Sequence, residues 1–223
     1  MPGVNAARAI LFDMDGTLVD TVPFILACVR HTFEGYGGGP TDAEWTAGIG
    51  TPLSEQLAQF TRRPEDVPVL VARYRLFWNE HHDARTRCFP GALETVSALA
   101  AGGHPLAVVT AKTERGAMRT LEHTGLARHL RAVVGSDSCA RGKPHPEPVL
   151  VALGRLGVGP AQAVLLGDSI HDILSARAAG VLALGAGWGA ATSEALMTAG
   201  AWRTLSDIRE LSAVLGTLET AAA

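Results

Sequence analysis

Short apolar runs that end in polar residues recur along this chain, and they constrain its fold more than any other feature. They lie at 9–12, 105–110, 132–135, 163–167 and 181–185. Runs of this length that alternate with helical segments indicate buried strands of a parallel sheet. The pattern therefore predicts a doubly wound α/β domain with right-handed crossovers between its strands.

Four segments between or after these runs have the apolar spacing of helices. They cover residues 93–99, 114–124, 171–179 and 206–218. Gly102 lies beyond the first as a common helix stop, and Thr113 precedes the second as a candidate N-cap. These helices would cover the faces of the predicted sheet.

Residues 21–88 interrupt this alternation, because they contain helical periods but no convincing strand. The clearest period is the apolar stripe of Val67, Leu70, Val71, Tyr74, Phe77 and Trp78. We interpret its aromatic residues as a local core and not as a ligand-binding box. Thr51 and Pro52 fit an N-cap followed by the first residue of a helix. We predict a helical cap at 21–88, inserted into a catalytic α/β core of 1–20 and 89–223.

The overall composition excludes several classes of protein. The net charge is −3 and the pI is near 6.2, so no global positive field would recruit nucleic acid or an anionic membrane. The three cysteines are far apart and form no Cys-x-x-Cys pair, which argues against a disulfide framework or a zinc site. The first apolar run is too short for a signal peptide or a membrane span. We expect a cytoplasmic protein.

Carboxylates follow the predicted strands where ligands of open parallel sheets bind. They are Asp13, Asp15, Asp168 and Asp172. Four carboxylates at one sheet edge would repel each other without a cation, and ligands that are all oxygen favour Mg²⁺. Each residue alone fits a turn or a helix cap, but their order at successive strand ends favours a shared site. Thr110 lies at the end of the second predicted strand, and Lys143 lies in the loop between the third and fourth.

In these residues the chain resembles the haloacid dehalogenase-like (HAD) hydrolases. The four matching motifs are Asp-Met-Asp-Gly-Thr-Leu at 13–18, the hydroxyl of Thr110, Gly-Lys-Pro-His-Pro at 142–146 and Gly-Asp-Ser-Ile-His-Asp at 167–172. The helical insertion is similar to the family's small α-helical cap. Segments 18–21, 89–91 and 187–189 resemble most the phosphoglycolate-phosphatase-like branch.

The resemblance implies a Mg²⁺-dependent phosphatase of a small phosphorylated metabolite. It makes Asp13 the nucleophile that becomes an aspartyl phosphate, and Asp15 the acid and base of the two half-reactions. Thr110 and Lys143 would hold the transferred phosphoryl group. Mg²⁺ would be bound by the Asp13 carboxylate, the Asp15 main-chain carbonyl and Asp168, with Asp172 behind them. A phosphoglycolate-like substrate is one option, and the sequence predicts no oligomeric state.

Three alternative functions share parts of this pattern. A haloacid dehalogenase needs the nucleophile but has no use for Asp15. A phosphomutase acting on a sugar phosphate would retain every core motif, so it stays open. A non-catalytic phospho-accepting module would place its acceptor after a middle strand, whereas Asp13 follows the first. Ala111 and His171 stand where related sequences often have Asn, and neither change removes a predicted catalytic group.

Substrate recognition is expected in the cap and in the loops that face it. The glycine-containing segment 48–52 is a candidate substrate loop, because glycine backbone can approach a ligand closely. Arg62, Arg63 and Arg87 are candidates for binding a carboxylate or a second phosphate. We interpret His81 and His82 as an exposed helix end. The segment 185–189 is predicted to form a loop near the site and not a dinucleotide fingerprint.

Overall fold

Six parallel strands form the sheet, one more than the apolar runs predict. The computed structural model describes residues 8–220, so residues 1–7 and 221–223 of the predicted core lie outside the described residues. The strands are β1 (Ala9–Phe12), β2 (Leu106–Val109), β3 (Ala132–Val134), β4 (Ala163–Gly167), β5 (Leu182–Ala186) and β6 (Arg203–Leu205). Their order is β3-β2-β1-β4-β5-β6. The predicted doubly wound fold is confirmed.

The sixth strand was not predicted because it has no apolar run. It is three residues long, and it begins with the exposed Arg203 and ends with the buried Leu205. Pairing with β5 alone holds it at the edge of the sheet. Such a short edge strand has too few residues for an alternation to show in the sequence.

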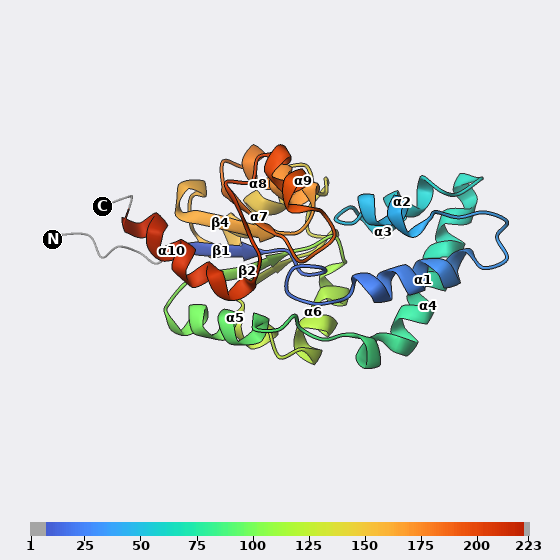
Figure 1. Ribbon diagram of the computed structural model, residues 1–223. Coiled ribbons are helices and arrows are strands. Elements are labelled where there is room, and N and C mark those ends of the chain that lie inside the picture. The colour runs from blue at the N-terminus through green and yellow to red at the C-terminus, as the bar shows by residue number, and fades with distance from the viewer. Residues whose placement is uncertain (1–7, 221–223) are drawn as a thin grey trace.

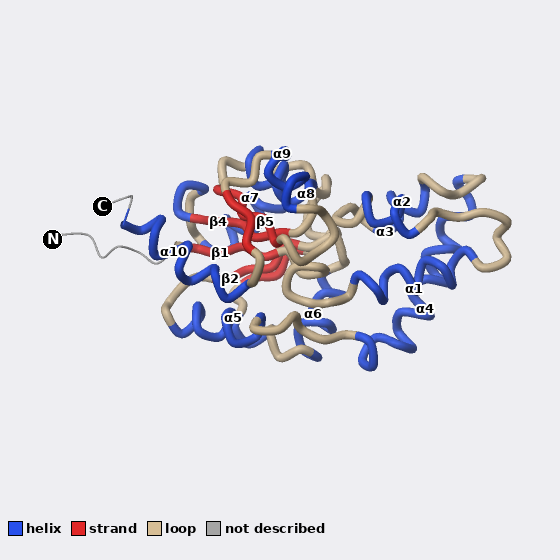
Figure 2. Tube along the Cα trace, viewed as in Figure 1, coloured by secondary structure: helices blue, strands red, loops and turns tan. Residues whose placement is uncertain are grey.

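Helices cover both faces of the sheet (Figures 1 and 2). One face carries α5 (Ala92–Ala101), α6 (Glu114–His123) and α10 (Leu211–Thr220), and the other α7 (Glu147–Leu156), α8 (Ile170–Ala178) and α9 (Ser193–Ala199). Ile10 and Phe12 of β1 point into the first layer, whereas Ala9 and Leu11 point into the second. The alternation follows from the two-residue repeat of a strand, and burial on both sides explains why the run is apolar throughout.

Three of the predicted core helices match α5, α6 and α8, and Thr113 caps α6 by accepting a hydrogen bond from the Gly116 amide. The fourth begins later than expected. A 3₁₀ turn at Ile208–Glu210 precedes α10, which starts at Leu211. The helices α7 and α9 were not predicted.

Four helices form the inserted segment, which lies beyond the carboxyl ends of the strands (Figure 1). They are α1 (Val22–Phe33), α2 (Asp42–Ala47), α3 (Leu53–Ala58) and α4 (Val67–Arg85). Leu70, Tyr74 and Trp78 of the predicted stripe are buried in a separate apolar cluster. Within it, the rings of Phe24 and Trp78 stack with their centroids 4.5 Å apart. The helical insertion therefore has a core of its own.

Two local predictions in this segment are wrong. Pro52, and not Thr51, is the N-cap residue of α3, while the Thr51 hydroxyl donates a hydrogen bond to the carbonyl of Gly48. His82 is fully buried and not at an exposed helix end, because α4 runs on to Arg85 and packs there against α6. The His82 Nε2 atom lies 2.9 Å from the Thr120 hydroxyl of that helix.

Among residues 8–220, every helix falls short of the length or the apolar character that crossing a membrane requires. The predicted cytoplasmic location stays a prediction.

Candidate active site

The parallel pairing of the strands brings the predicted site residues to one edge of the sheet. The pairing continues one residue beyond each strand: the Asp13 amide donates to the Leu166 carbonyl, and the Thr110 amide to that of Val134, both at 2.9 Å. The chain winds from β1 towards β3 in one direction and towards β6 in the other. Asp13 therefore follows the strand at which the winding reverses, where α/β sheets form their ligand crevices.

Three buried carboxylates form the centre of the site. Oxygen atoms of Asp13, Asp168 and Asp172 lie within 4.8 Å of one another. The Lys143 ammonium lies between two of them, 2.6 Å from Asp13 Oδ1 and 2.5 Å from Asp172 Oδ1. It also donates to the Val109 carbonyl at 3.2 Å. A solvated loop lysine would not be enclosed in this way, so Lys143 is part of the cluster.

Local hydrogen bonds orient two of these carboxylates. Asp168 accepts from the Thr17 hydroxyl at 3.0 Å and from the Ala190 amide at 2.7 Å. Asp172 Oδ2 accepts from the amide and the hydroxyl of Ser169 in a capping box at the start of α8. The second Asp172 oxygen remains for Lys143. Asp172 is thus both a helix-cap residue and a member of the site.

Two glycines let the backbone approach Asp168 closely. Gly16 has φ +84°, and a Cβ atom there would lie 2.1 Å from Asp168 Oδ2. A Cβ atom at Gly189 would lie 2.2 Å from the Asp168 Cβ and 2.5 Å from the Gly16 carbonyl oxygen. Gly185 and Ala186 of the predicted 185–189 loop belong to β5, so the loop begins at Gly187, and its Gly189 approaches Asp168 closely.

Burial and crowding raise the pKa values of Asp13 and Asp168. For Asp13, burial raises the pKa well above its usual range, with Asp172 and Asp168 adding to the rise and Lys143 opposing it. Burial and the Asp172 charge raise the pKa of Asp168 to about 7. Burial alone would lower the pKa of Lys143, but Asp13 and Asp172 outweigh it and hold the ammonium charged. Ionising all three carboxylates would therefore leave negative charge that one ammonium does not balance.

The donor set fits a divalent cation of the Mg²⁺ type. Three ionised carboxylates and one ammonium carry −3 + 1 = −2 charges, which an ion of charge +2 neutralises. All of the side-chain donors are oxygen, the ligand type that Mg²⁺ prefers. A bound cation would favour the charged forms of these carboxylates and so oppose the effect of burial on their pKa values.

Asp15 lies beside this cluster but has different partners. Its carboxylate accepts from the Thr21 hydroxyl and pairs with the Lys112 ammonium. The same ammonium lies over the ring of Trp78. The carboxylate group of Asp13, Asp168 and Asp172 does not include that of Asp15, among residues 8–220. The predicted metal role of Asp15 involves its main-chain carbonyl and stays a prediction.

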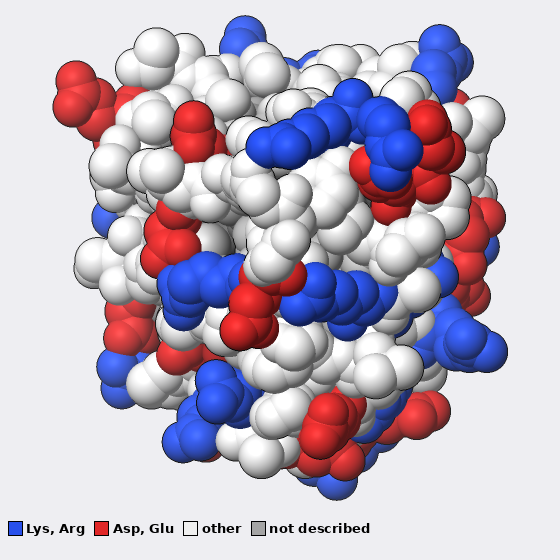
Figure 3. All heavy atoms as spheres, turned by 90° about the vertical axis from the view of Figure 1, so that its right-hand side faces the viewer, with Lys and Arg blue, Asp and Glu red and all other residues white. Residues whose placement is uncertain are grey.

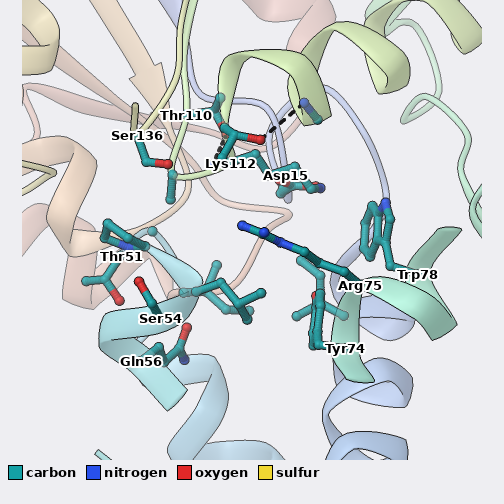
Figure 4. Close-up of a pocket in the computed structure, with 18 of the residues that line it drawn as sticks. Asp15, Thr51, Ser54, Gln56, Tyr74, Arg75, Trp78, Thr110, Lys112 and Ser136 are labelled. Atoms are coloured by element: carbon teal, nitrogen blue, oxygen red, sulfur yellow. Dashed lines mark hydrogen bonds and ion pairs between the residues drawn. The ribbon is translucent and has the colours of Figure 1, made fainter. Parts of the chain in front are cut away.

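A cleft of about 770 Å³ lies between the core and the helical segment (Figure 4). Asp13, Asp15 and Thr110 line its core side, and the segment 49–52 lines the opposite side, as expected for a substrate loop. Tyr74 and Trp78 also line it. These two rings therefore belong both to the cap's apolar cluster and to the cleft, which corrects their interpretation as core alone.

The arginines that line the cleft are not those that the sequence analysis selected. Arg62 donates to the Gly37 carbonyl and Arg63 pairs with Asp66, while Arg87 borders a separate shallow pocket. The cleft is lined instead by Arg75, Lys112, Arg115 and Arg119. Arg75 directly follows Tyr74 of the apolar stripe, and this position at the edge of the stripe was the available signal. Elsewhere on the cap end, charges of both signs are interspersed (Figure 3).

A comparison with known protein families shows to which family this chain belongs. The family model described as haloacid dehalogenase-like hydrolase matches residues 10–186. The chain belongs to this family. The predicted resemblance, fold class and enzyme class, that of a HAD-type phosphoric monoester hydrolase, are thereby confirmed.

Individual relatives cover almost the whole HAD chain. It is 35% identical over 213 residues to pyrophosphatase PpaX of Bacillus pumilus (strain SAFR-032), which covers 95% of this chain and 98% of that protein. It is 33% identical over 212 residues to a phosphoglycolate phosphatase of Chromobacterium violaceum, covering 92% and 94%. A solved hydrolase of Pseudomonas syringae has a TM-score of 0.86 at 23% identity, covering 95% and 98%, and shows the same fold.

Proposed function

We propose that this HAD hydrolase is a Mg²⁺-dependent phosphatase that hydrolyses a small phosphomonoester through an aspartyl phosphate on Asp13. The observation that carries the proposal is the position of Asp13, which belongs to the buried carboxylate cluster and also lines the cleft. Lys143 donates to Asp13 Oδ1 and so fixes the orientation of the carboxylate. We also propose the division into a core of 1–20 and 89–223 and a cap of 21–88.

In the first half-reaction, a carboxylate oxygen of Asp13 attacks phosphorus and the bond from phosphorus to the leaving oxygen breaks. Asp15 gives its proton to that oxygen, so the leaving group departs as an alcohol or its equivalent. The Thr110 hydroxyl and Lys143 stabilise the charge on the transferred oxygens. Bound Mg²⁺, held by Asp13, the Asp15 carbonyl and Asp168, would reduce the repulsion between the carboxylate and the phosphate.

In the second half-reaction, Asp15 takes a proton from a water molecule, which attacks the phosphorus of the aspartyl phosphate. Inorganic phosphate leaves, and the Asp13 carboxylate is restored. The pairing of Asp15 with Lys112 and Thr21 fixes its carboxylate on the core side of the cleft, where both proton transfers occur. One residue thus serves as acid and then as base.

The experiment is phosphate release from a panel of small phosphoesters with Mg²⁺, comparing the wild type with Asp13→Asn. We expect release by the wild type, its loss in the variant and its loss with a chelator. Asp42→Asn, at an exposed cap position that pairs with Arg30, is the matched control and should keep full activity. Full activity of Asp13→Asn would overturn the mechanism. Phosphoryl transfer to a sugar phosphate without release of phosphate would instead show a mutase.

A further inference from the structure

Two arginines in the cleft have charges that the protein itself does not neutralise. Among the four cations that line the cleft, Lys112 pairs with Asp15. Arg119 donates to Asn79 at 3.0 Å and pairs with Asp83 at 3.2 Å. Within residues 8–220, the guanidinium groups of Arg75 and Arg115 have neither a hydrogen-bond acceptor nor an ion-pair partner.

The acids that line the cleft are already engaged. Asp13 pairs with Lys143, and Asp15 pairs with Lys112. Asp137 accepts a hydrogen bond of 2.7 Å from the Glu114 amide at the start of α6. Within the described chain no lining acid forms an ion pair with either guanidinium group. The four lining cations also outnumber the three lining acids, so a bound anion would balance the excess positive charge.

The two arginines come from different parts of the chain. Arg75 lies on α4 of the proposed cap. Figure 4 shows its side chain extending from that helix into the cleft, which Asp15 and Thr110 line from the core. Arg115 lies in the first turn of α6, which follows Thr110 in the core. An anion that contacts both would join the cap to the core.

We infer that Arg75 and Arg115 form a second anion-binding subsite, which recognises a carboxylate or phosphate on the leaving group of the substrate. This inference rests on the proposed function, because it assumes that the transferred phosphoryl group lies at Asp13. A guanidinium group presents paired N–H donors that match the two oxygens of a carboxylate or a phosphate. The preferred substrates are therefore small phosphate compounds with a second anionic group.

The first test compares kcat/KM with Mg²⁺ for three substrates. Phosphoglycolate offers a carboxylate, pyrophosphate offers a phosphate, and 2-hydroxyethyl phosphate offers a neutral hydroxyl. We expect the wild type to prefer at least one anionic substrate over the neutral one. The anionic substrate with the higher kcat/KM identifies whether the subsite favours a carboxylate or a phosphate.

Single substitutions then test the two arginines. Arg75→Gln and Arg115→Gln should each lower kcat/KM for the preferred anionic substrate about 10- to 100-fold, as expected for the loss of a charged hydrogen bond. The neutral substrate should change by less than about 3-fold, since the chemistry at Asp13 is untouched. Arg75→Lys should restore part of the preference. Arg63→Gln removes the same charge from the cap outside the cleft and should change none of these values.

A binding measurement separates this inference from the proposed function. Methylenediphosphonate is a stable analogue with two anionic groups, and methylphosphonate has one. We expect Arg75→Gln to weaken the binding of the first and to leave that of the second unchanged. This binding result without hydrolysis of any substrate would preserve the subsite and reject the phosphatase. Hydrolysis of all three substrates with equal losses, or no loss, in Arg75→Gln would reject the subsite alone.

Discussion

The ammonium group of Lys112 lies 4.0 Å from the centre of the Trp78 ring. Trp78 belongs to α4 of the proposed cap, whereas Lys112 follows β2 in the core, two residues after Thr110. The same ammonium pairs with Asp15. One core side chain therefore contacts both the proposed acid and base and a helix of the cap, so the position of the cap and the setting of Asp15 are coupled.

Replacing Lys112 should impair both contacts. Lys112→Met removes a cation–π contact worth about 0.5–2 kcal/mol and the ion pair with Asp15. We expect the melting temperature to fall by about 2–4 °C and kcat to fall about 10-fold. Lys112→Arg keeps the charge and is the control. If Lys112→Met left the melting temperature and kcat unchanged, the two contacts would not couple the position of the cap to the setting of Asp15.

Asp15→Asn should separate the two half-reactions. The amide cannot donate or accept the proton that each step needs, so turnover should fall about 10²- to 10⁴-fold. The rate of phosphoenzyme formation should fall less for a substrate with a good leaving group, such as 4-nitrophenyl phosphate, because its departure needs no proton. Rapid-quench measurement of phosphoenzyme with that substrate checks the assignment, since the variant should accumulate it. Equal losses in the rate of phosphoenzyme formation with good and poor leaving groups would contradict the role of Asp15 as the acid.

The core of the site was predictable because local patterns determine it. Each strand is a short apolar run, and the residue after it falls at the carboxyl edge of the sheet whatever the distant packing. Asp13, Thr110 and Asp168 were placed in this way, and Asp172 followed from its position four residues after Asp168, in the first turn of α8. The buried position of Lys143 could be expected only from the family motif, because its loop has no periodicity of its own.

The lining of the cleft was not predictable from the same patterns. Whether Arg75 or Arg63 reaches a ligand depends on how the helices of the cap pack, and both are arginines of the same helical insertion. His82 illustrates the same limit. It is buried only because α4 meets Thr120 of α6, which is 38 residues away along the chain. Local spacing contains no information on such contacts.

The stability of the metal-free protein should depend on pH through Asp168. Its pKa is about 7 in the fold and 3.8 in an unfolded chain, because burial and the Asp172 charge raise it. Above pH 4 the folded state therefore binds more protons than the unfolded state at this group, and the group's contribution to stability falls as the pH rises towards 7. Asp168→Asn removes this contribution.

Denaturant unfolding with a chelator from pH 5 to 8 checks this expectation. The stability of Asp168→Asn relative to the wild type should increase up to about pH 7 and then level off. Added Mg²⁺ should stabilise the wild type more at pH 8 than at pH 5, because its ligands must be ionised, and should stabilise the variant less. A stability difference independent of pH would show that Asp168 titrates normally.

Gly189→Ala should disturb Asp168 without removing any polar group. The added methyl would lie 2.2 Å from the Asp168 Cβ and 2.5 Å from the Gly16 carbonyl oxygen, so backbone or side chain must shift. We expect a loss of about 1–3 kcal/mol in stability and a weaker response to Mg²⁺. Gly154→Ala is the matched control, since it lies within α7 and its Cβ would meet open space. That variant should gain about 0.5–1 kcal/mol from helix propensity and keep full activity. If Gly189→Ala matched the control in melting and in Mg²⁺ response, the close approach of the 185–189 loop to Asp168 would be wrong.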